Sequence, residues 1–392
     1  MGQGRTARLL GALTLLLVIA LGSPIPLGAQ PVPTATVRTQ TAIEFPGGMR
    51  FTAEIPVAGD DIDHVDLLYR LGADETLYLT AVPGTGLTRA GNALTVDVFV
   101  DMQESFVPMG VELTFHWELS AGGTVVQATP DETAMWIDNR FDWTTIESDQ
   151  VTLYSYEASD AFARRMLDNA QATIDELETR FALDRIAPIS VWVYASGEDM
   201  SGTRQANSRE AVAGLSYLDT GTTAVIIPDG NESELGRVLP HEISHLVLDQ
   251  ATRNPFSTPP LWFNEGLATH VQVGGTGHYP GIVARAEASG GLYDIASLEV
   301  SFPYAAEQVT LAYASSWSMV AYIEETYGDD GIARLIAAFG SGQPTADAVE
   351  TALGVTPESL NAAWHAWVRV KATPAAIAAQ GHDVPGPSGR LC

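Results

Sequence analysis

Two histidines and a glutamate lie close together in the segment HEISH at residues 241–245. Residues four apart on an α-helix lie on the same side of it, one turn along. Both imidazoles, of His241 and His245, can therefore face one metal ion. Glu242 lies about 100° around such a helix from His241, near the ion without necessarily binding it. This position suits a general base acting on a metal-bound water.

A third metal ligand is expected from the segment NEGLA at residues 264–268. Glu265 follows His245 with nineteen residues between them, so it would come from a second helix. Two histidines and one glutamate with one open position are a catalytic zinc arrangement. Pro259 and Pro260 give the second helix a sharp start. We therefore predict one Zn²⁺ per chain, bound by His241, His245 and Glu265.

Two polar or helix-breaking residues bear on the geometry of the first helix. Pro240 lies directly before His241 and removes the backbone hydrogen bond to Gly236, so a kink or a tightened turn is expected there. Asp249, four residues beyond His245, is either a hydrogen-bond partner that orients a ligand or an ordinary polar residue near the helix end.

Together, HEISH and NEGLA resemble the metal-binding segments of the gluzincins of the peptidase MA clan, and the layout is similar to bacterial proteins with a peptidase MA-like domain. The resemblance covers roughly residues 140–372. It implies that His241, His245 and Glu265 bind zinc, that Glu242 is the catalytic base, and that Tyr313 stabilises the oxyanion. It also implies a small mixed sheet whose edge strand binds substrate, then the zinc helix and a helical subdomain.

The role of Tyr313 depends on this resemblance more than on the local pattern. A phenol that donates to a developing oxyanion is sound chemistry. The same helix is also rich in apolar residues, so a tyrosine in the core is the alternative. Tyr304, Tyr322 and His278 are other candidate donors.

The chain departs from related families at several positions. Metzincins have Gly and His three and six residues beyond the second histidine, where this chain has Leu248 and Ala251, so that class is excluded. Thermolysin-like relatives commonly have an acid four residues beyond the zinc glutamate, where this chain has Thr269. His270 is about 140° around the helix from Glu265, which disfavours a ligand role. The Gly-x-Met-Glu-Asn segment of aminopeptidases in the clan is absent, which disfavours aminopeptidase action.

Residues 140–374 are expected to form an α+β metallopeptidase domain. Strands are predicted at 151–156 and 189–194, and a hairpin at 215–218 and 223–227, whose second strand is expected to pair with substrate. Asn231 is expected to cap the zinc helix, with Glu234 as its capping-box partner. Helical spacing predicts helices at 159–181, 232–250, 260–272, 308–327, 329–340, 344–353 and 356–371.

Residues 36–138 show the alternation of β-strands with one buried face. The clearest runs lie at 49–57, 94–100 and 111–119, and glycine-rich turns separate them. About seven strands in about 100 residues predict an immunoglobulin-like sandwich that acts as an accessory domain. Trp117 is in phase with the apolar side of its run and is expected in the core.

The N-terminal segment has the order of a secretory signal peptide: Arg5 and Arg8, an apolar run from Leu9 to Leu21, then small residues. We predict a signal peptide at 1–29, with an uncleaved anchor as the alternative, and a secreted or cell-surface protein without stable membrane insertion after cleavage. Residues 375–392 are expected to form a flexible tail.

The composition narrows the classes of partner and cofactor. A formal net charge of −28 disfavours nucleic acid as a partner. The single cysteine, Cys392, leaves His, Asp and Glu as metal ligands. The pattern favours an exported zinc metallopeptidase that cleaves peptide or protein substrates. The alternatives are an extracellular binding or adhesion protein with a structural or inactive zinc site, and a coincidental HEISH segment in an unrelated helix.

Overall fold

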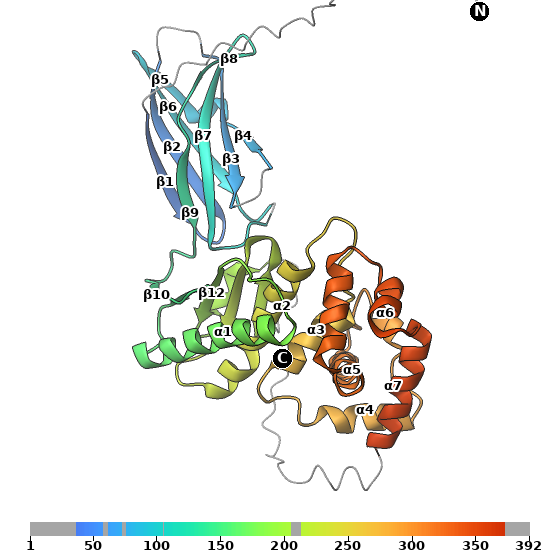
Figure 1. Ribbon diagram of the computed structural model, residues 1–392. Helices are drawn as coiled ribbons and strands as arrows, with labels where there is room; N and C mark the ends of the chain where they lie inside the picture. Colours follow the sequence, from blue (N-terminus) through green and yellow to red (C-terminus); the bar gives the residue numbers. More distant parts are fainter. Residues whose placement is uncertain (1–36, 58–61, 73–75, 105, 205–212, 373–392) are drawn as a thin grey trace, which may run out of the picture.

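The computed structural model describes residues 37–57, 62–72, 76–104, 106–204 and 213–372. The predicted signal peptide at 1–29 and the predicted tail at 375–392 lie outside the described residues. Figure 1 shows an elongated region of strands, a second sheet flanked by helices beside its end, and a lobe of helices next to that sheet.

The N-terminal region consists of two antiparallel sheets. One has the strand order β1-β2-β6-β5, and the other has the order β4-β3-β7-β8, with β9 also paired to β7. The strands are β1 Arg38–Glu44, β2 Gly48–Pro56, β3 His64–Leu71, β4 Tyr78–Ala81, β5 Leu87–Ala90, β6 Ala93–Asp101, β7 Val111–Ala121, β8 Thr124–Ala128 and β9 Glu132–Trp136.

Alternation in the sequence correctly identified the buried face of these sheets. The apolar positions of the runs at 49–57, 94–100 and 111–119 are buried, and Trp117 is fully buried in the core as predicted. The described residues of the N-terminal region form nine strands, β1 to β9, where about seven were predicted. Short strands such as β4 and β5 are largely exposed and have little alternation, so periodicity gives a weak signal for them.

The second sheet is mixed, with the order β10-β11-β12-β14-β13. Its strands are β10 Thr144–Glu147, β11 Val151–Ser155, β12 Ile189–Tyr194, β13 Gly214–Tyr217 and β14 Thr222–Ile226. The predicted hairpin is confirmed, because β13 and β14 are antiparallel neighbours. The expectation that residues 223–227 pair with substrate is wrong: β14 lies between β12 and β13, so its backbone is already paired on both sides. Among the described strands, β10 and β13 are the two edges of this sheet, and β13 is the edge beside β14.

The two faces of the mixed sheet pack against different partners. Val191 and Val193 of β12 belong to the core that includes α1 (Asp160–Arg180) and α2 (Glu232–Thr252). Trp192 and Tyr194, which alternate with them, join the core of the N-terminal region. The end of the N-terminal region, including Met109 and Gly110, therefore packs on one face of the mixed sheet, and the helices α1 and α2 pack on the other.

A buried ion pair lies at this junction. Asp138 is fully buried, and it accepts hydrogen bonds from Arg140 Nε at 2.9 Å and from the Tyr194 hydroxyl at 3.0 Å. Burial and the Asp138 charge raise the pKa of Tyr194, so its hydroxyl keeps the proton that it donates. Together with the shared apolar core, this network ties the N-terminal region to the mixed sheet.

Helices form the remainder of the chain. They are α3 Leu261–Val271, α4 Tyr279–Ala288, α5 Ala306–Gly340, α6 Thr345–Leu353 and α7 Pro357–Lys371. Gly328 interrupts α5 with a non-helical backbone, φ 70° and ψ 179°. This agrees with the prediction of two separate helices, at 308–327 and 329–340. No helix is predicted from the sequence at the position of α4. In the described part of the chain, no helix combines the length and apolarity needed to cross a bilayer.

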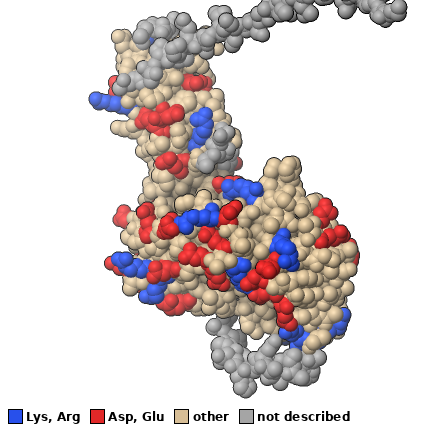
Figure 2. All heavy atoms as spheres, in the orientation of Figure 1, with Lys and Arg blue, Asp and Glu red and all other residues tan. Residues whose placement is uncertain are grey.

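Charged side chains of both signs are interspersed on the face shown in Figure 2, where acidic and basic groups lie beside one another over the helical and β regions.

Candidate metal centre

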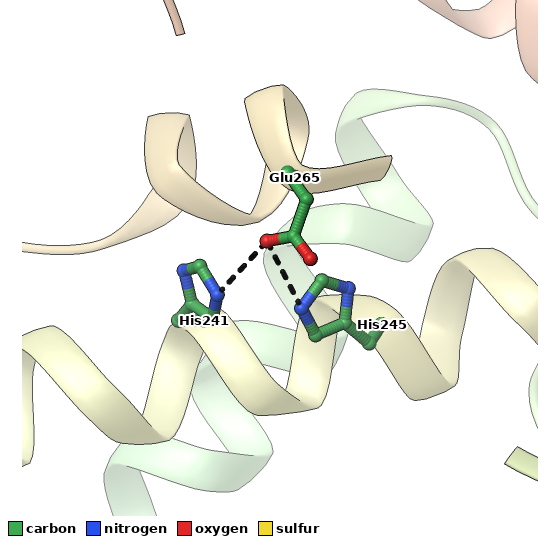
Figure 3. A group of neighbouring side chains, drawn as sticks. All are labelled: His241, His245 and Glu265. Atoms are coloured by element: carbon green, nitrogen blue, oxygen red, sulfur yellow. Dashed lines mark ion pairs between the residues drawn. The ribbon is translucent and has the colours of Figure 1, made fainter. Parts of the chain in front are cut away.

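The histidines of HEISH and the glutamate of NEGLA converge from two packed helices. His241 and His245 point from α2 toward Glu265 on α3, as Figure 3 shows. Glu265 Oε2 lies 3.6 Å from His241 Nε2 and 3.8 Å from His245 Nε2. One ligand atom from each residue lies within 4.8 Å of the others, and each side chain is 11–18% exposed. The three side chains are therefore mostly buried, but solvent still reaches part of each.

An unpartnered oxygen indicates that this group fits a metal ion. Glu265 Oε2 is buried and has no hydrogen-bond partner among the residues that the structure describes, although it faces both imidazoles. Its 3.6 Å separation from His241 Nε2 is too long for a hydrogen bond. Ligand atoms about 2.0–2.1 Å from one tetrahedral zinc ion lie roughly 3.4 Å apart, close to the observed separations. Two nitrogens and one carboxylate also match the donor set of catalytic zinc sites.

The electrostatics of the group favour a positive charge. Burial lowers the pKa of His241, but the Glu265 carboxylate, the Glu242 charge and the Gln272 side chain outweigh it and raise that pKa overall. Burial raises the pKa of Glu265, but the His245 charge, the neighbouring His241 and a hydrogen bond from Tyr313 outweigh it and lower that pKa overall. A divalent cation would satisfy the same field.

Uncharged side chains orient the histidines. His245 Nδ1 lies 2.8 Å from Asn264 Oδ1, so the amide oxygen accepts the Nδ1 proton and leaves Nε2 free toward Glu265. The Gln272 side chain similarly accepts a hydrogen bond from His241. Asp249, the alternative considered from the sequence, does not orient a ligand: it accepts from Arg253 Nε at 3.1 Å on the surface.

Pro240 does not break α2, which runs from Glu232 to Thr252. The carbonyl of Gly236, which loses its helical partner at Pro240, accepts instead from the backbone N–H of Val273 at 2.7 Å. The segment that follows α3 is therefore attached to α2 one turn before His241. The Asn231 side chain caps α2 as predicted by accepting from Glu234 N, but Asn231 N donates to Pro228 O, so the reciprocal half of the capping box is absent.

Glu242 lies on the side of α2 that faces the edge strand. Its side chain is buried, and the Ser216 hydroxyl on β13 lies 2.8 Å from its Oε2. Sequence reasoning identified Glu242 but not this contact. A serine in a short strand carries no pattern that distinguishes it from any other polar strand residue.

Tyr313 of α5 lies at the metal group, because it forms a hydrogen bond with the Glu265 carboxyl and its ring contacts Phe302 at 5.1 Å. The other candidate donors are placed differently. Tyr322 is buried against Tyr327 and Trp367, and the Tyr304 side chain is 88% exposed. No contact with the metal group is recorded for His278 within the described residues; its ring packs against Tyr279.

His270 and Thr269 lie on α3 beyond Glu265 without joining the group. His270 Nε2 is 2.8 Å from Glu324 Oε2, and the same carboxylate binds Arg180. Burial, with the charge of Arg180, lowers the pKa of His270 to about 4, so it is neutral at pH 7. The Thr269 hydroxyl is buried without a hydrogen-bond partner among the described residues. Thr269 therefore does not replace the acid that thermolysin-like relatives have at this position.

A family model agrees with this geometry. Residues 169–370, just over half of the chain, match the family model of the peptidase MA superfamily. No curated protein matches the chain. The chain is similar to the crystal structure of an aminopeptidase N family protein from Idiomarina loihiensis, at 10% identity and a TM-score of 0.34, covering 86% of this chain and 71% of that chain. It is also similar to a putative β-galactosidase from Bacteroides fragilis, at 10% identity and a TM-score of 0.17, covering 44% and 25%. Neither structural likeness is strong enough to carry an argument.

Proposed function

The chain belongs to the peptidase MA superfamily, and from this premise we propose that it is an exported zinc-dependent metallopeptidase. The observation that carries the proposal is the convergence of His241, His245 and Glu265 around a buried carboxylate oxygen that lacks a hydrogen-bond partner in the described part of the chain. We propose these three side chains as the zinc ligands. The zinc ion, when bound, would polarise the scissile carbonyl and lower the pKa of water.

The side chains around the ligands supply the remaining roles. Glu242, beside His241, is proposed to accept a proton from the attacking water and to pass it to the leaving amine. Tyr313, which reaches the Glu265 carboxyl, is proposed to donate a hydrogen bond to the oxyanion as it forms. The 11–18% exposure of the ligand side chains leaves a side of the group through which a substrate carbonyl would enter.

The substrate is proposed to be a peptide or protein segment in an extended conformation. Among the described strands, β13 is the edge of the mixed sheet nearest Glu242, and its free side can pair with an extended chain. Such pairing uses main-chain groups and is tolerant of side-chain sequence. Specificity would then come from the side chains that surround the metal group.

The N-terminal region, proposed as an accessory domain at 36–138, is proposed to be an immunoglobulin-like sandwich, because its two antiparallel sheets enclose one core. The metallopeptidase domain is proposed to span 140–374. Export through a cleaved segment at 1–29, to a secreted or cell-surface location, rests on the order of charged, apolar and small residues in the sequence. Mass spectrometry of the protein recovered outside the producing cells tests this, because cleavage would give a new N-terminus near Gln30.

The catalytic proposal is tested with the wild type and Glu242→Gln on a quenched peptide library, with zinc content measured on the same samples. Glu242→Gln keeps the size of the side chain but removes the base, so it should retain zinc and lose cleavage. Equal cleavage by both proteins would contradict the role of Glu242. One zinc per chain with no cleavage by the wild type would instead favour the alternative of a binding protein.

A further inference from the structure

The edge strand β13 contacts the proposed base Glu242 through two positions that share one face. Ser216 Oγ lies 2.8 Å from Glu242 Oε2 and 2.9 Å from the Glu242 main-chain oxygen. A Cβ atom at Gly214 would lie 2.5 Å from Glu242 Cγ and 2.6 Å from its Oε1, closer than any real Cβ contact. The carboxylate therefore rests against the backbone at Gly214, and the Ser216 hydroxyl holds one of its oxygens.

Other contacts fix this strand independently of α2. Ser216 pairs with Thr223 on β14, and the Thr223 hydroxyl donates to the Leu215 carbonyl at 3.0 Å. The Tyr217 ring lies 5.8 Å from that of Phe106 in the N-terminal region, and the Tyr217 hydroxyl donates to the carbonyl of Thr203, which lies between β12 and β13. The position of Ser216 is thus set by the sheet and by the N-terminal region, and Ser216 transmits that position to Glu242.

We propose that Ser216 is a positioning residue for Glu242, an inference that rests on the proposed peptidase function. Its hydroxyl donates to Oε2 and fixes the plane of the carboxylate beside the metal group. The same strand is the proposed binding edge for substrate, so β13 sets the position of the base and of the substrate together. Ser216 touches neither the metal group nor the bond to be cleaved in this account, so it acts only through Glu242.

The test compares kcat, KM and zinc content for the wild type, Ser216→Ala, Ser216→Thr and Ser190→Ala on a quenched peptide. Ser216→Ala should lower kcat by about 10- to 100-fold, part of the 10²–10⁴ that a positioned base typically contributes. Its KM and zinc content should stay within about two-fold of the wild type, because the ligands are untouched. Ser216→Thr retains the hydroxyl and should recover most of kcat. Ser190 lies in the same sheet without contact to Glu242, so Ser190→Ala is the matched control and should behave as the wild type.

The same substitution, made in the wild type and in the variant Glu242→Asp, shows whether Ser216 acts through Glu242. Glu242→Asp shortens the side chain by one methylene and withdraws the carboxylate from Ser216. Adding Ser216→Ala to Glu242→Asp should therefore lower kcat by less than about three-fold further. An equal fall in kcat on adding Ser216→Ala to the wild type and to Glu242→Asp would overturn the proposal. If Ser216→Ala does not fold, Ser216→Cys, similar in size but a weaker donor, replaces it with the same expectation.

The failure of this inference is distinguishable from the failure of the proposed function. If the wild type cleaves peptide and Ser216→Ala remains within about two-fold of it, the positioning role is wrong and the peptidase function stands. If the wild type holds zinc and cleaves no peptide, the proposed function is wrong, and the positioning role is wrong with it.

Discussion

The hydrogen bond between Asn264 and His245 leads to a quantitative prediction about zinc affinity. Asn264 Oδ1 lies 2.8 Å from His245 Nδ1 in a part-buried setting, and it fixes the tautomer that presents Nε2 to the metal. Loss of such a partner typically weakens metal binding by about 10- to 100-fold, or about 1.4–2.7 kcal/mol. Asn264→Ala should therefore raise the Kd for zinc by that factor, because His245 loses its orientation while all three ligands remain.

The assay is a competition titration of zinc against a chromogenic chelator. Thr269→Ala is the matched control, since Thr269 is buried on the same helix and its hydroxyl has no partner among the described residues. The control should bind zinc as the wild type does. Asn264→Asp should bind zinc more tightly than Asn264→Ala, because a carboxylate also accepts from Nδ1 and increases the basicity of the imidazole. An unchanged Kd in Asn264→Ala, or an equal loss in Thr269→Ala, would refute the reasoning.

The remaining predictions concern the strand beside Glu242 and the buried His270. Gly214→Ala should lower kcat by about 100-fold or more with zinc content unchanged, because the new methyl group displaces the base; full activity would contradict the close approach. Burial and the charge of Arg180 lower the pKa of His270 in the folded protein to about 4, whereas an unfolded histidine has a pKa of about 6.5. Between these two pH values the unfolded chain therefore binds a proton at His270 more readily than the folded chain does. The free energy of unfolding of the wild type should therefore fall as the pH drops from about 6.5 to 4. Over the same pH range, His270→Gln should lose roughly 3 kcal/mol less of its free energy of unfolding than the wild type. Urea unfolding at pH 7 and pH 4 measures the difference, and equal losses in the two proteins would contradict it.

Local patterns in the sequence predicted the features that depend on residues close together in the chain. The four-residue spacing of His241 and His245 fixes their shared side of a helix in any fold. The alternation at 111–119 predicted the buried face of β7, including Trp117. Gly328 separated two predicted helices, and the structure shows a non-helical residue there.

Features that depend on distant residues were not predicted. The strand order of the mixed sheet places β14 inside and β13 at the edge, which reverses the expected substrate strand. Ser216 meets Glu242 only because β13 packs across α2. Val273 meets Gly236 only because the chain returns after α3, and this contact explains how α2 tolerates Pro240. No local spacing encodes these contacts.

The partner of His245 shows an intermediate case. Asn264 directly precedes the predicted ligand Glu265, so the NEGLA segment contained the signal. From the sequence only Asp249, four residues beyond His245, was considered, and it was left open between an orienting partner and an ordinary polar residue. In the structure Asp249 faces Arg253 at the surface, and the partner comes from the neighbouring helix. An orienting partner on a second helix becomes visible only when the packing of α2 and α3 is known.

The central claim is that zinc held by His241, His245 and Glu265 makes this protein a peptidase. The most direct measurement removes metal with a chelator, adds zinc back stepwise, and follows cleavage of an unfolded protein substrate. The metal-free protein should cleave nothing, and activity should rise linearly with added zinc until one zinc per chain is bound. Cleavage that persists without metal, or zinc binding at one per chain with no cleavage of any peptide, would contradict it.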